Sequence, residues 1–382
     1  MANENIYENV TTIGASSGFR GVEKKFWVVC NDKNYMYKID DDHNYGFGEM
    51  FASYLLPKLG VDCVNVLPAQ DQENKTSGVI VESFLNPSVS LTLTMGELVE
   101  IVKPKFYCYE HCNFSLEELL RLEPKLNEKN AYFMPDVMKK FKQMVVCDFF
   151  LGNRDRHINN VEFLVYQGQN GEKYLDLTPM FDNGRILGLG AGSGMMAGQE
   201  LAYSDSPKMT LNRRQGKKRG TALTKSVGIS ILDEMEQDPE VKKLVEKFLS
   251  LDFDKIIDEF HKNSPYELNF FVIRTIKDYF NERVKLFKEL MQIKQQKPRK
   301  LKEYFFDPVT FPLFRKPWGK LKEDFCKNNN QIVTEAMPGL FDKVIIQKQV
   351  AAQQEINVEI KENQQQAMQG SGKDEDCASE WL

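Results

Sequence analysis

The chain has 382 residues, of which 42% are hydrophobic and 27% are charged, a composition typical of a globular protein with a substantial core. Its formal net charge is −5. Because a general nucleic-acid binder is normally basic, direct nucleic-acid binding is not expected. The sequence contains no apolar run of about eighteen residues, the length that a membrane-spanning helix needs, so no membrane association is expected.

The first residues of the chain and its cysteines indicate the cellular compartment in which the protein is expected. Residues 1–10 have neither the basic nor the apolar segment of a signal peptide. Seven cysteines, an odd number at scattered spacing, favour reduced thiols. The close pair Cys108 and Cys112 has no second pair to complete a zinc site and is interpreted as structural. The sequence predicts a cytoplasmic protein, with secretion as an effector as the alternative.

Residues 1–88 are predicted to form a small β-rich unit. The segments 24–31 and 35–40 are rich in aromatic and β-branched residues and are separated by a turn signal, which predicts a hairpin. Residues 48–60 have helical apolar spacing that ends at Gly60, with Pro57 disturbing the last turn. Residues 63–70 and 77–85 return to strand character.

From about residue 90 the apolar spacing becomes helical. Ser115 and Glu118 form the pattern of a capping box, and a long buried helix is expected from Pro135 to Gly152. Residues 161–167 and 173–182 resemble a second hairpin. The clearest helix is 267–293, with an apolar stripe from Val272 to Ile293.

These patterns predict an α+β, two-lobed protein-kinase-like fold in four segments. They are an N-lobe over 1–88, a mainly helical C-lobe over 89–296, a C-terminal extension over 297–346 and a disordered tail over 347–382. A kinase-type phosphotransferase needs a glycine-rich loop, a lysine, a partner glutamate, a catalytic aspartate with an asparagine, and a second metal-binding aspartate. The chain has a candidate for each.

The first three candidates lie in the N-lobe. A glycine-rich loop lets backbone amides approach phosphate oxygens, although a surface turn would explain the same glycines. Lys38 ends a strand and could reach the phosphates, or its ammonium could extend to solvent. Glu49 is eleven residues further on and would fix the lysine. The candidate loop residues are Gly14, Ser16, Ser17, Gly18 and Gly21.

The stretch "RDRHINN" supplies the catalytic candidates. Asp155 and Asn160 have the D-x-x-x-x-N spacing of kinase catalytic loops. Asp155 would orient the attacking hydroxyl, and Asn160 would hold a metal ion, with Asn159 as the alternative. His157 is expected to brace the loop through hydrogen bonds.

Asp182 follows an apolar run and precedes Gly184, the position for a carboxylate that bridges Mg²⁺ to phosphates, although a turn residue would fit as well. Residues 188–195 resemble a dinucleotide fingerprint but do not open a helix after a first strand, and are interpreted as a flexible segment. The basic residues in 212–220 form either a solvated loop or a docking patch for an acidic substrate.

"GNRDRHINN" together with "LTPMFDNG" resembles the HipA-like serine/threonine kinases, and the N-terminal half is similar to their CtkA-type members. The resemblance covers about residues 10 to 290. It implies ATP with Mg²⁺, Lys38 on the phosphates, Asp155 as catalytic base, and Asn160 and Asp182 as metal ligands. Adenine would be read by backbone groups of Glu82, Ser83, Phe84 and Leu85.

The resemblance also implies autophosphorylation at Ser16 or Ser17, and a role as a toxin or a secreted effector. An antitoxin-like regulator is a candidate partner, although the extra N-terminal subdomain of HipA toxins has no counterpart here. The protein substrate is not identified by the sequence. Two alternatives remain: a lipid or small-molecule kinase, since phosphoinositide kinases share a D-R-H-x-x-N loop, and a binding module that keeps the fold without catalysis.

Overall fold

The computed structural model of the chain describes most residues between the first strand and residue 296. They are 8–9, 11–12, 25–30, 33–40, 44–72, 75–85, 89, 91–102, 114–187, 209–211, 220–264, 268 and 270–296. The expected glycine-rich loop, the 188–195 segment, the Cys108–Cys112 pair, nearly all of the basic cluster, the C-terminal extension and the tail lie outside the described residues.

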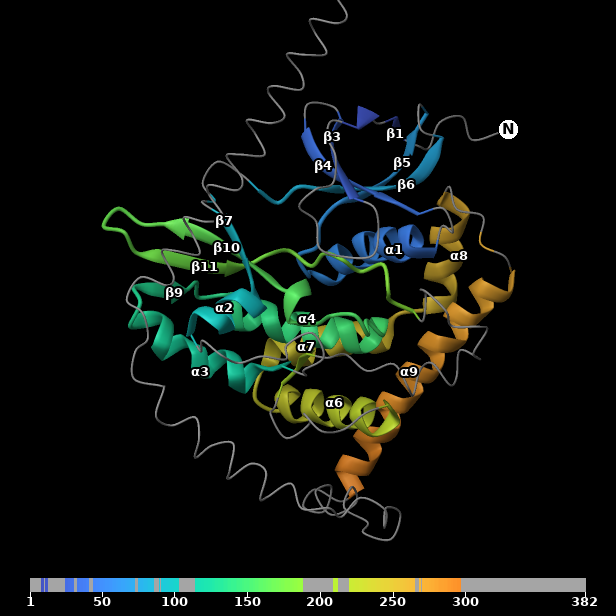
Figure 1. Cartoon of the computed structure of the whole chain (residues 1–382). Coiled ribbons are helices and arrows are strands. Elements are labelled where there is room, and N and C mark those ends of the chain that lie inside the picture. Colours follow the sequence, from blue (N-terminus) through green and yellow to red (C-terminus); the bar gives the residue numbers. More distant parts are fainter. Residues whose placement is uncertain are drawn as a thin grey trace, which may run out of the picture.

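The N-terminal part contains a six-stranded sheet (Figure 1). In spatial order its strands are β1 (Glu8–Asn9), β5 (Val66–Asp71), β6 (Thr76–Glu82), β4 (Lys33–Ile39), β3 (Lys25–Cys30) and β2 (Thr11–Thr12). All neighbours pair antiparallel except β1 and β5, which are parallel. The hairpin of β3 and β4 that the sequence predicts is present.

Helix α1 (Asn44–Leu59) packs beneath this sheet (Figure 1). It begins before the Gly48 start that was expected, because the Asp40 carboxylate accepts a hydrogen bond from the Gly46 amide in its first turn. Pro57 lies inside the helix without ending it, and Gly60, with φ of +81°, terminates it. The buried rings of Phe47 and Phe51 anchor α1 to the helices that follow.

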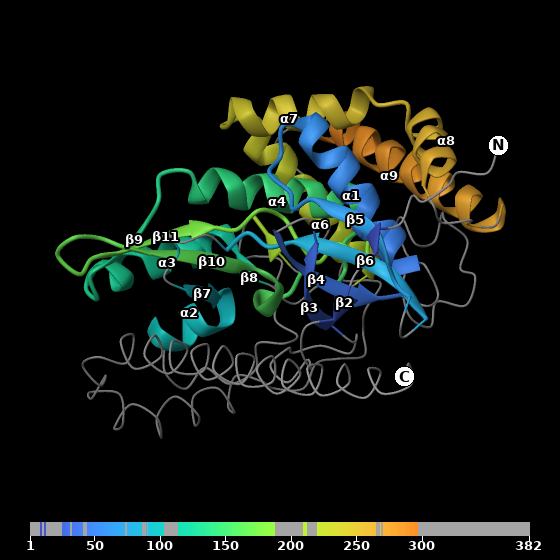
Figure 2. The same cartoon turned by 90° about the horizontal axis from the view of Figure 1, so that it is seen from above.

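A second sheet lies on the other side of the molecule from the last two helices (Figures 1 and 2). Its strands are β7 (Leu91–Thr94), β10 (Glu162–Gln167), β11 (Lys173–Leu177) and β9 (Ala131–Phe133), in that order. The β10–β11 hairpin was predicted, but β7 was not. Helical spacing was expected from residue 90, and the strand forms there because Leu93 pairs with Phe163 of β10, a distant partner.

Helices make up the rest of the described C-terminal part. They are α2 (Met95–Val102), α3 (Leu116–Asn127), α4 (Val137–Leu151), the 3₁₀ turn η1 (Ile158–Asn160), α6 (Gly220–Met235), α7 (Pro239–Ser250), α8 (Phe253–Asn263) and α9 (Phe270–Gln296). Two short strands, β8 (Phe114–Ser115) and β12 (Met209–Thr210), pair in parallel. The capping box predicted at Ser115 and Glu118 is present.

Helix α4 is the central element of this part, because its final turns are buried on all sides against α6, α7 and α9. It ends at Gly152, which adopts the left-handed conformation with φ of +68°. On α9 the predicted stripe is buried as far as Leu290, but Ile293 is 40% exposed because the helix outruns its packing partners. None of the described helices has the length and apolar character needed to span a membrane.

Candidate active site

Lys38 lies where the small sheet meets the helical part. It is on β4, its side chain is 10% exposed, and Nζ donates to Glu49 Oε1 at 2.5 Å and to Asp182 Oδ1 at 2.8 Å. Glu49 comes from α1 and Asp182 from the loop after β11. The lysine–glutamate contact expected from the sequence is present, and the side chain is not one that extends to solvent.

Lys38 and Asp182 hold each other in their charged forms. Burial lowers the pKa of Lys38, but Asp182 and Glu49 outweigh it, so the pKa is raised above its usual value. Burial would raise the pKa of Asp182, but Lys38, Lys25 and Arg156 hold it well below its usual range. At neutral pH the site therefore contains a lysinium beside an ionised aspartate.

The Asp182 loop is fitted closely onto α1. The second carboxylate oxygen of Glu49, Oε2, accepts a hydrogen bond from the Asn183 amide at 2.9 Å. A Cβ at Gly48 would lie 2.9 Å from the Gly184 carbonyl oxygen, so a glycine is required for this approach. Asp182 itself has φ of +54°, a conformation that non-glycine residues adopt rarely and often at functional sites.

Asp155 lines the same pocket as Lys38, Glu49 and Asp182. It lies in the loop between Gly152 and η1, and its backbone is fixed from both sides. Its amide donates to Asn153 Oδ1 at 3.1 Å, and its carbonyl accepts from Asn160 Nδ2 at 3.0 Å. The two residues placed at catalytic-loop spacing are thus in direct contact, although Asn160 lines a neighbouring cavity rather than this pocket.

Two further polar residues of the loop, His157 and Asn159, contact their surroundings through their side chains. His157 Nδ1 accepts a hydrogen bond from the Asn159 amide at 3.2 Å and caps η1, as expected for a residue that stabilises the loop. The Asn159 side chain lies against Gly96 of α2, in a contact that a Cβ at position 96 would not allow. Of the two asparagines, Asn160 is therefore the one whose side chain contacts Asp155.

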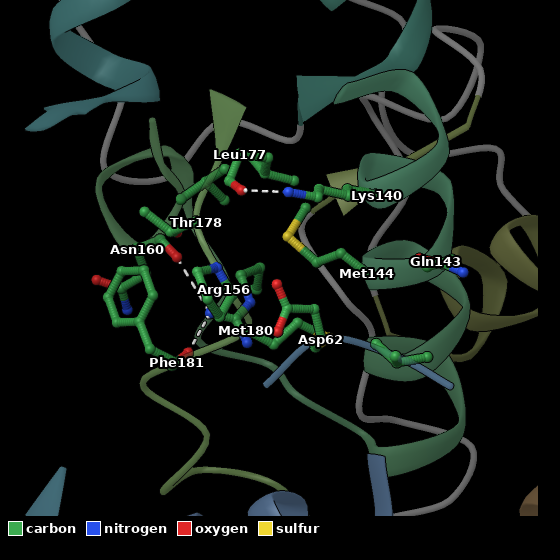
Figure 3. A pocket seen from close by; sticks show the side chains of 13 residues that line it. Asp62, Lys140, Gln143, Met144, Arg156, Asn160, Leu177, Thr178, Met180 and Phe181 are labelled. Atoms are coloured by element: carbon green, nitrogen blue, oxygen red, sulfur yellow. Dashed lines mark hydrogen bonds between the residues drawn. The ribbon is translucent and has the colours of Figure 1, made fainter. Parts of the chain in front are cut away.

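Arg156, which no sequence pattern singled out, lies between Asn160 and Phe181 and contacts both (Figure 3). It is 1% exposed. Nη1 donates to the carbonyls of Asn160 at 3.1 Å and Phe181 at 2.5 Å, and Nη2 donates to Asn183 Oδ1 at 2.7 Å. One guanidinium thus ties the loop that contains Asp155 to the residues on either side of Asp182.

The counter-charge of Arg156 is Asp148 on α4, whose Oδ2 accepts from Nε at 3.1 Å. Burial raises the pKa of Asp148 to about 6, and Arg156 and Asn153 offset only part of this effect. An aspartate inside the apolar run "VVCDFFL" was the sequence signal for such a pair, since a buried charge needs a partner.

Two further cations, one that acts on Asp182 and one that contacts Asp155, were also missed. Lys25 on β3 is directly opposite Lys38 on β4 and contributes to the lowered pKa of Asp182. Arg185 Nε lies 3.5 Å from Asp155 Oδ2. Neither residue has a spacing signal of its own, because both reach the site through long-range packing.

The segment expected to read adenine follows β6 directly. The Glu82 amide donates to the Asn65 carbonyl, the Ser83 amide to the Asn34 carbonyl, and the Leu85 amide to Ser83 Oγ. Among the described residues none accepts a hydrogen bond from the Phe84 amide. The Phe84 ring lies 5.6 Å from that of Phe181, next to Asp182.

No protein-family model matches the chain, and no curated protein matches it in sequence. Solved structures are similar to it. The crystal structure of the proinflammatory kinase CtkA of Helicobacter pylori matches 75% of this chain and 97% of its own, with 17% identity and a TM-score of 0.47. HipA of Shewanella oneidensis MR-1, in a complex with HipB and operator DNA, matches 73% of this chain and 67% of its own, with 13% identity and a TM-score of 0.46. The resemblance expected from the motifs is confirmed.

Proposed function

We propose that the chain is an ATP-dependent serine/threonine protein kinase of the HipA-like type, with a two-lobed protein-kinase-like fold. The small lobe is the six-stranded sheet with α1, and the larger lobe contains the second sheet with helices α2 to α4 and α6 to α9. The observation that carries the proposal is the Lys38 ammonium, held between Glu49 and Asp182 in a pocket that Asp155 also lines. These are the charged groups that phosphoryl transfer requires.

Lys38 binds the α- and β-phosphates in this proposal. Its raised pKa keeps the ammonium charged, and Glu49 fixes its position from α1. Because Asp182 is also held by its loop, the distance between the phosphate-binding cation and the metal-binding carboxylate is set by the fold.

Asp155 acts on the acceptor hydroxyl. It accepts a hydrogen bond from the serine or threonine hydroxyl, whose oxygen forms the new bond to the γ-phosphorus while the bond to the β–γ bridging oxygen breaks and ADP leaves. The hydroxyl proton passes to the Asp155 carboxylate. The backbone contacts with Asn153 and Asn160 keep this residue in place during transfer.

The side chains present fit a magnesium ion, which binds in proteins through one or two carboxylates together with substrate phosphates. Asp182 supplies an ionised carboxylate. The Asn160 amide donates through Nδ2 to Asp155, which leaves Oδ1 as its ligand atom. When bound, the ion neutralises charge on the phosphate oxygens. We place adenine against Phe84, with the Phe84 amide and the carbonyls of Glu82 and Leu85 at its edge.

Incubation of the purified chain with ATP and Mg²⁺, followed by intact-mass and peptide mass spectrometry, tests the proposal. A phosphate gain in the wild type, absent in Asp155→Asn, is expected, with Ser16 or Ser17 as proposed acceptors. Phosphorylation of phosphatidylinositol vesicles without a gain on protein would favour the lipid-kinase alternative. Absence of transfer to protein, lipid or water would contradict phosphotransfer altogether.

A further inference from the structure

Arg185 contacts two parts of the candidate active site that come from distant regions of the chain. Its Nε lies 3.5 Å from Asp155 Oδ2, and its guanidinium carbon lies 5.6 Å from the centre of the Tyr45 ring. Tyr45 is in the first turn of α1. Arg185, Tyr45 and Asp155 all line the Lys38 pocket, so one side chain connects the catalytic loop with the helix that carries Glu49.

The backbone next to Arg185 is placed by α1. A Cβ at Gly184 would lie 2.8 Å from Tyr45 Cδ1. This contact adds to the close approach of Gly48 to the Gly184 carbonyl. Because Gly184 immediately precedes Arg185, this packing places the backbone next to Arg185 against α1.

The contact with Arg185 is made by the side chain of Asp155. The hydrogen bonds from Asn160 and to Asn153 involve the Asp155 main chain. The Arg185 contact involves the carboxylate, which is the group that must face the acceptor hydroxyl. The two side chains are 31% and 26% exposed, so the pair is screened by water less than a surface ion pair.

We propose that Arg185 is a positioning residue for Asp155, held on Tyr45 so that the carboxylate is oriented only while α1 is docked against the Asp182 loop. This inference rests on the proposed function. Arg185 makes alignment of the base depend on the same helix that supplies Glu49 to Lys38, so both halves of the site are assembled by one docking event.

Steady-state kinetics of phosphate transfer from ATP, with intact-mass readout, separate positioning from binding. We expect Arg185→Gln to lower kcat about 10- to 100-fold, the effect of misplacing a catalytic group by about an ångström. The KM for ATP should change less than about threefold, because Lys38 and Asp182 are untouched.

Arg185→Lys should recover only part of the loss, since an ammonium cannot reproduce the planar guanidinium on the Tyr45 ring. Arg274→Gln removes the same charge from an exposed position on α9 and serves as the matched control with wild-type kinetics.

The role of Tyr45 is tested by a double-mutant cycle. Tyr45→Leu removes the ring under the guanidinium and should lower kcat, whereas Tyr45→Phe keeps the ring and should lower it less. In the Arg185→Gln background, Tyr45→Leu should add little further loss, because its effect passes through Arg185. Full additivity of the two losses would overturn this part of the proposal.

Crystal structures of the wild type and of Arg185→Gln decide the positioning claim independently of activity. The expected result is a displaced Asp155 carboxylate, with the Asp155 backbone and the Lys38–Asp182 contact unchanged. An Asp155 carboxylate in the same place, or a wild-type kcat in Arg185→Gln, would overturn the proposal. Failure of the proposed function gives a different result, namely a wild type that transfers no phosphate, and the crystallographic comparison would still decide whether Arg185 orients Asp155.

Discussion

The ammonium of Lys38 lies 2.8 Å from the carboxylate of Asp182, although 144 positions separate the two residues in sequence. Lys38 belongs to the small sheet and Asp182 to the loop after β11. The contact therefore exists only when both parts of the molecule are folded against each other. Glu49 and Asp155 line the same pocket.

Lys38→Met removes the main cation between two partly or fully buried carboxylates. Because breaking a buried ion pair leaves an uncompensated charge, the free energy of unfolding should fall by about 3–5 kcal/mol. Urea denaturation followed by circular dichroism measures this loss. Lys33→Met is a matched control on the same strand, since Lys33 pairs with Glu82 at 2.9 Å but its side chain is 61% exposed. That variant should lose much less stability than Lys38→Met, because an exposed ion pair contributes little, and equal losses would contradict the assignment of Lys38 as the buried centre.

Arg156→Lys tests the guanidinium that joins the two loops. A lysine cannot donate simultaneously to Asp148, the two carbonyls and Asn183, so the unfolding free energy should fall by about 3 kcal/mol or more. Differential scanning calorimetry gives the change. Arg121→Lys on α3, where the pair with Glu117 is 4.0 Å and exposed, should change stability by less than about 0.5 kcal/mol. An Arg156→Lys protein as stable as this control would show that the loops do not depend on Arg156.

Gly48→Ala places a methyl group 2.9 Å from the Gly184 carbonyl oxygen. In an isolated helix the change would be stabilising by about 1 kcal/mol, but here α1 must move away from the Asp182 loop. We expect the rate of phosphate transfer from ATP to fall about tenfold or more, as catalytic groups become misplaced. Gly171→Ala in the β10–β11 turn has no atom within 4 Å of the new Cβ but a φ of +86°. It should lower stability without changing the rate, and a wild-type rate in Gly48→Ala would contradict the close-docking account.

The buried thiols provide a test that does not depend on activity. The pKa of Cys63 is raised to about 12, mainly by burial and secondly by the nearby Glu49 carboxylate. Burial also raises the pKa of Cys147 well above its ordinary value. Both should remain protonated at pH 8 and react slowly with iodoacetamide, because the thiolate is the nucleophile. Peptide mass spectrometry should find both unmodified in native protein and both alkylated in urea.

The same shift fixes the sign of a stability change at high pH. The folded-state pKa of Cys63 is above the ordinary thiol value of 9.0, so its contribution to stability is fully present below pH 9 and is lost as the pH rises toward about 12. Rapid alkylation of native Cys63 at pH 8 would contradict both expectations.

Local patterns were sufficient to find the residues at element boundaries. Asp155 follows a buried helix, Lys38 ends a strand and Asp182 follows a hairpin, so polar residues there stand out against apolar runs. The spacing of Asp155 and Asn160 reflects a short turn whose internal hydrogen bond is local. These positions could be predicted because the signal and the contact lie within a few residues of each other.

Contacts between distant segments could not be predicted in this way. Asp148, inside an apolar run, indicated that a buried cation would pair with it. The sequence does not show whether this cation is Arg154 or Arg156, because the two arginines flank Asp155 symmetrically. Only the fold shows that Arg156 is buried against Asp148. In the same way, β7 depends on pairing with β10, and Arg185 contacts Asp155 from a separate loop.

The most direct test of the central claim is a crystal structure of the full chain with magnesium and a non-hydrolysable ATP analogue. The proposed function predicts phosphates on Lys38, a metal ion on Asp182 and Asn160, and adenine beside Phe84. The γ-phosphate should then lie next to Asp155. An analogue bound elsewhere, or no binding at millimolar concentration while Lys38 stays paired with Asp182, would contradict the assignment of this pocket as the nucleotide site.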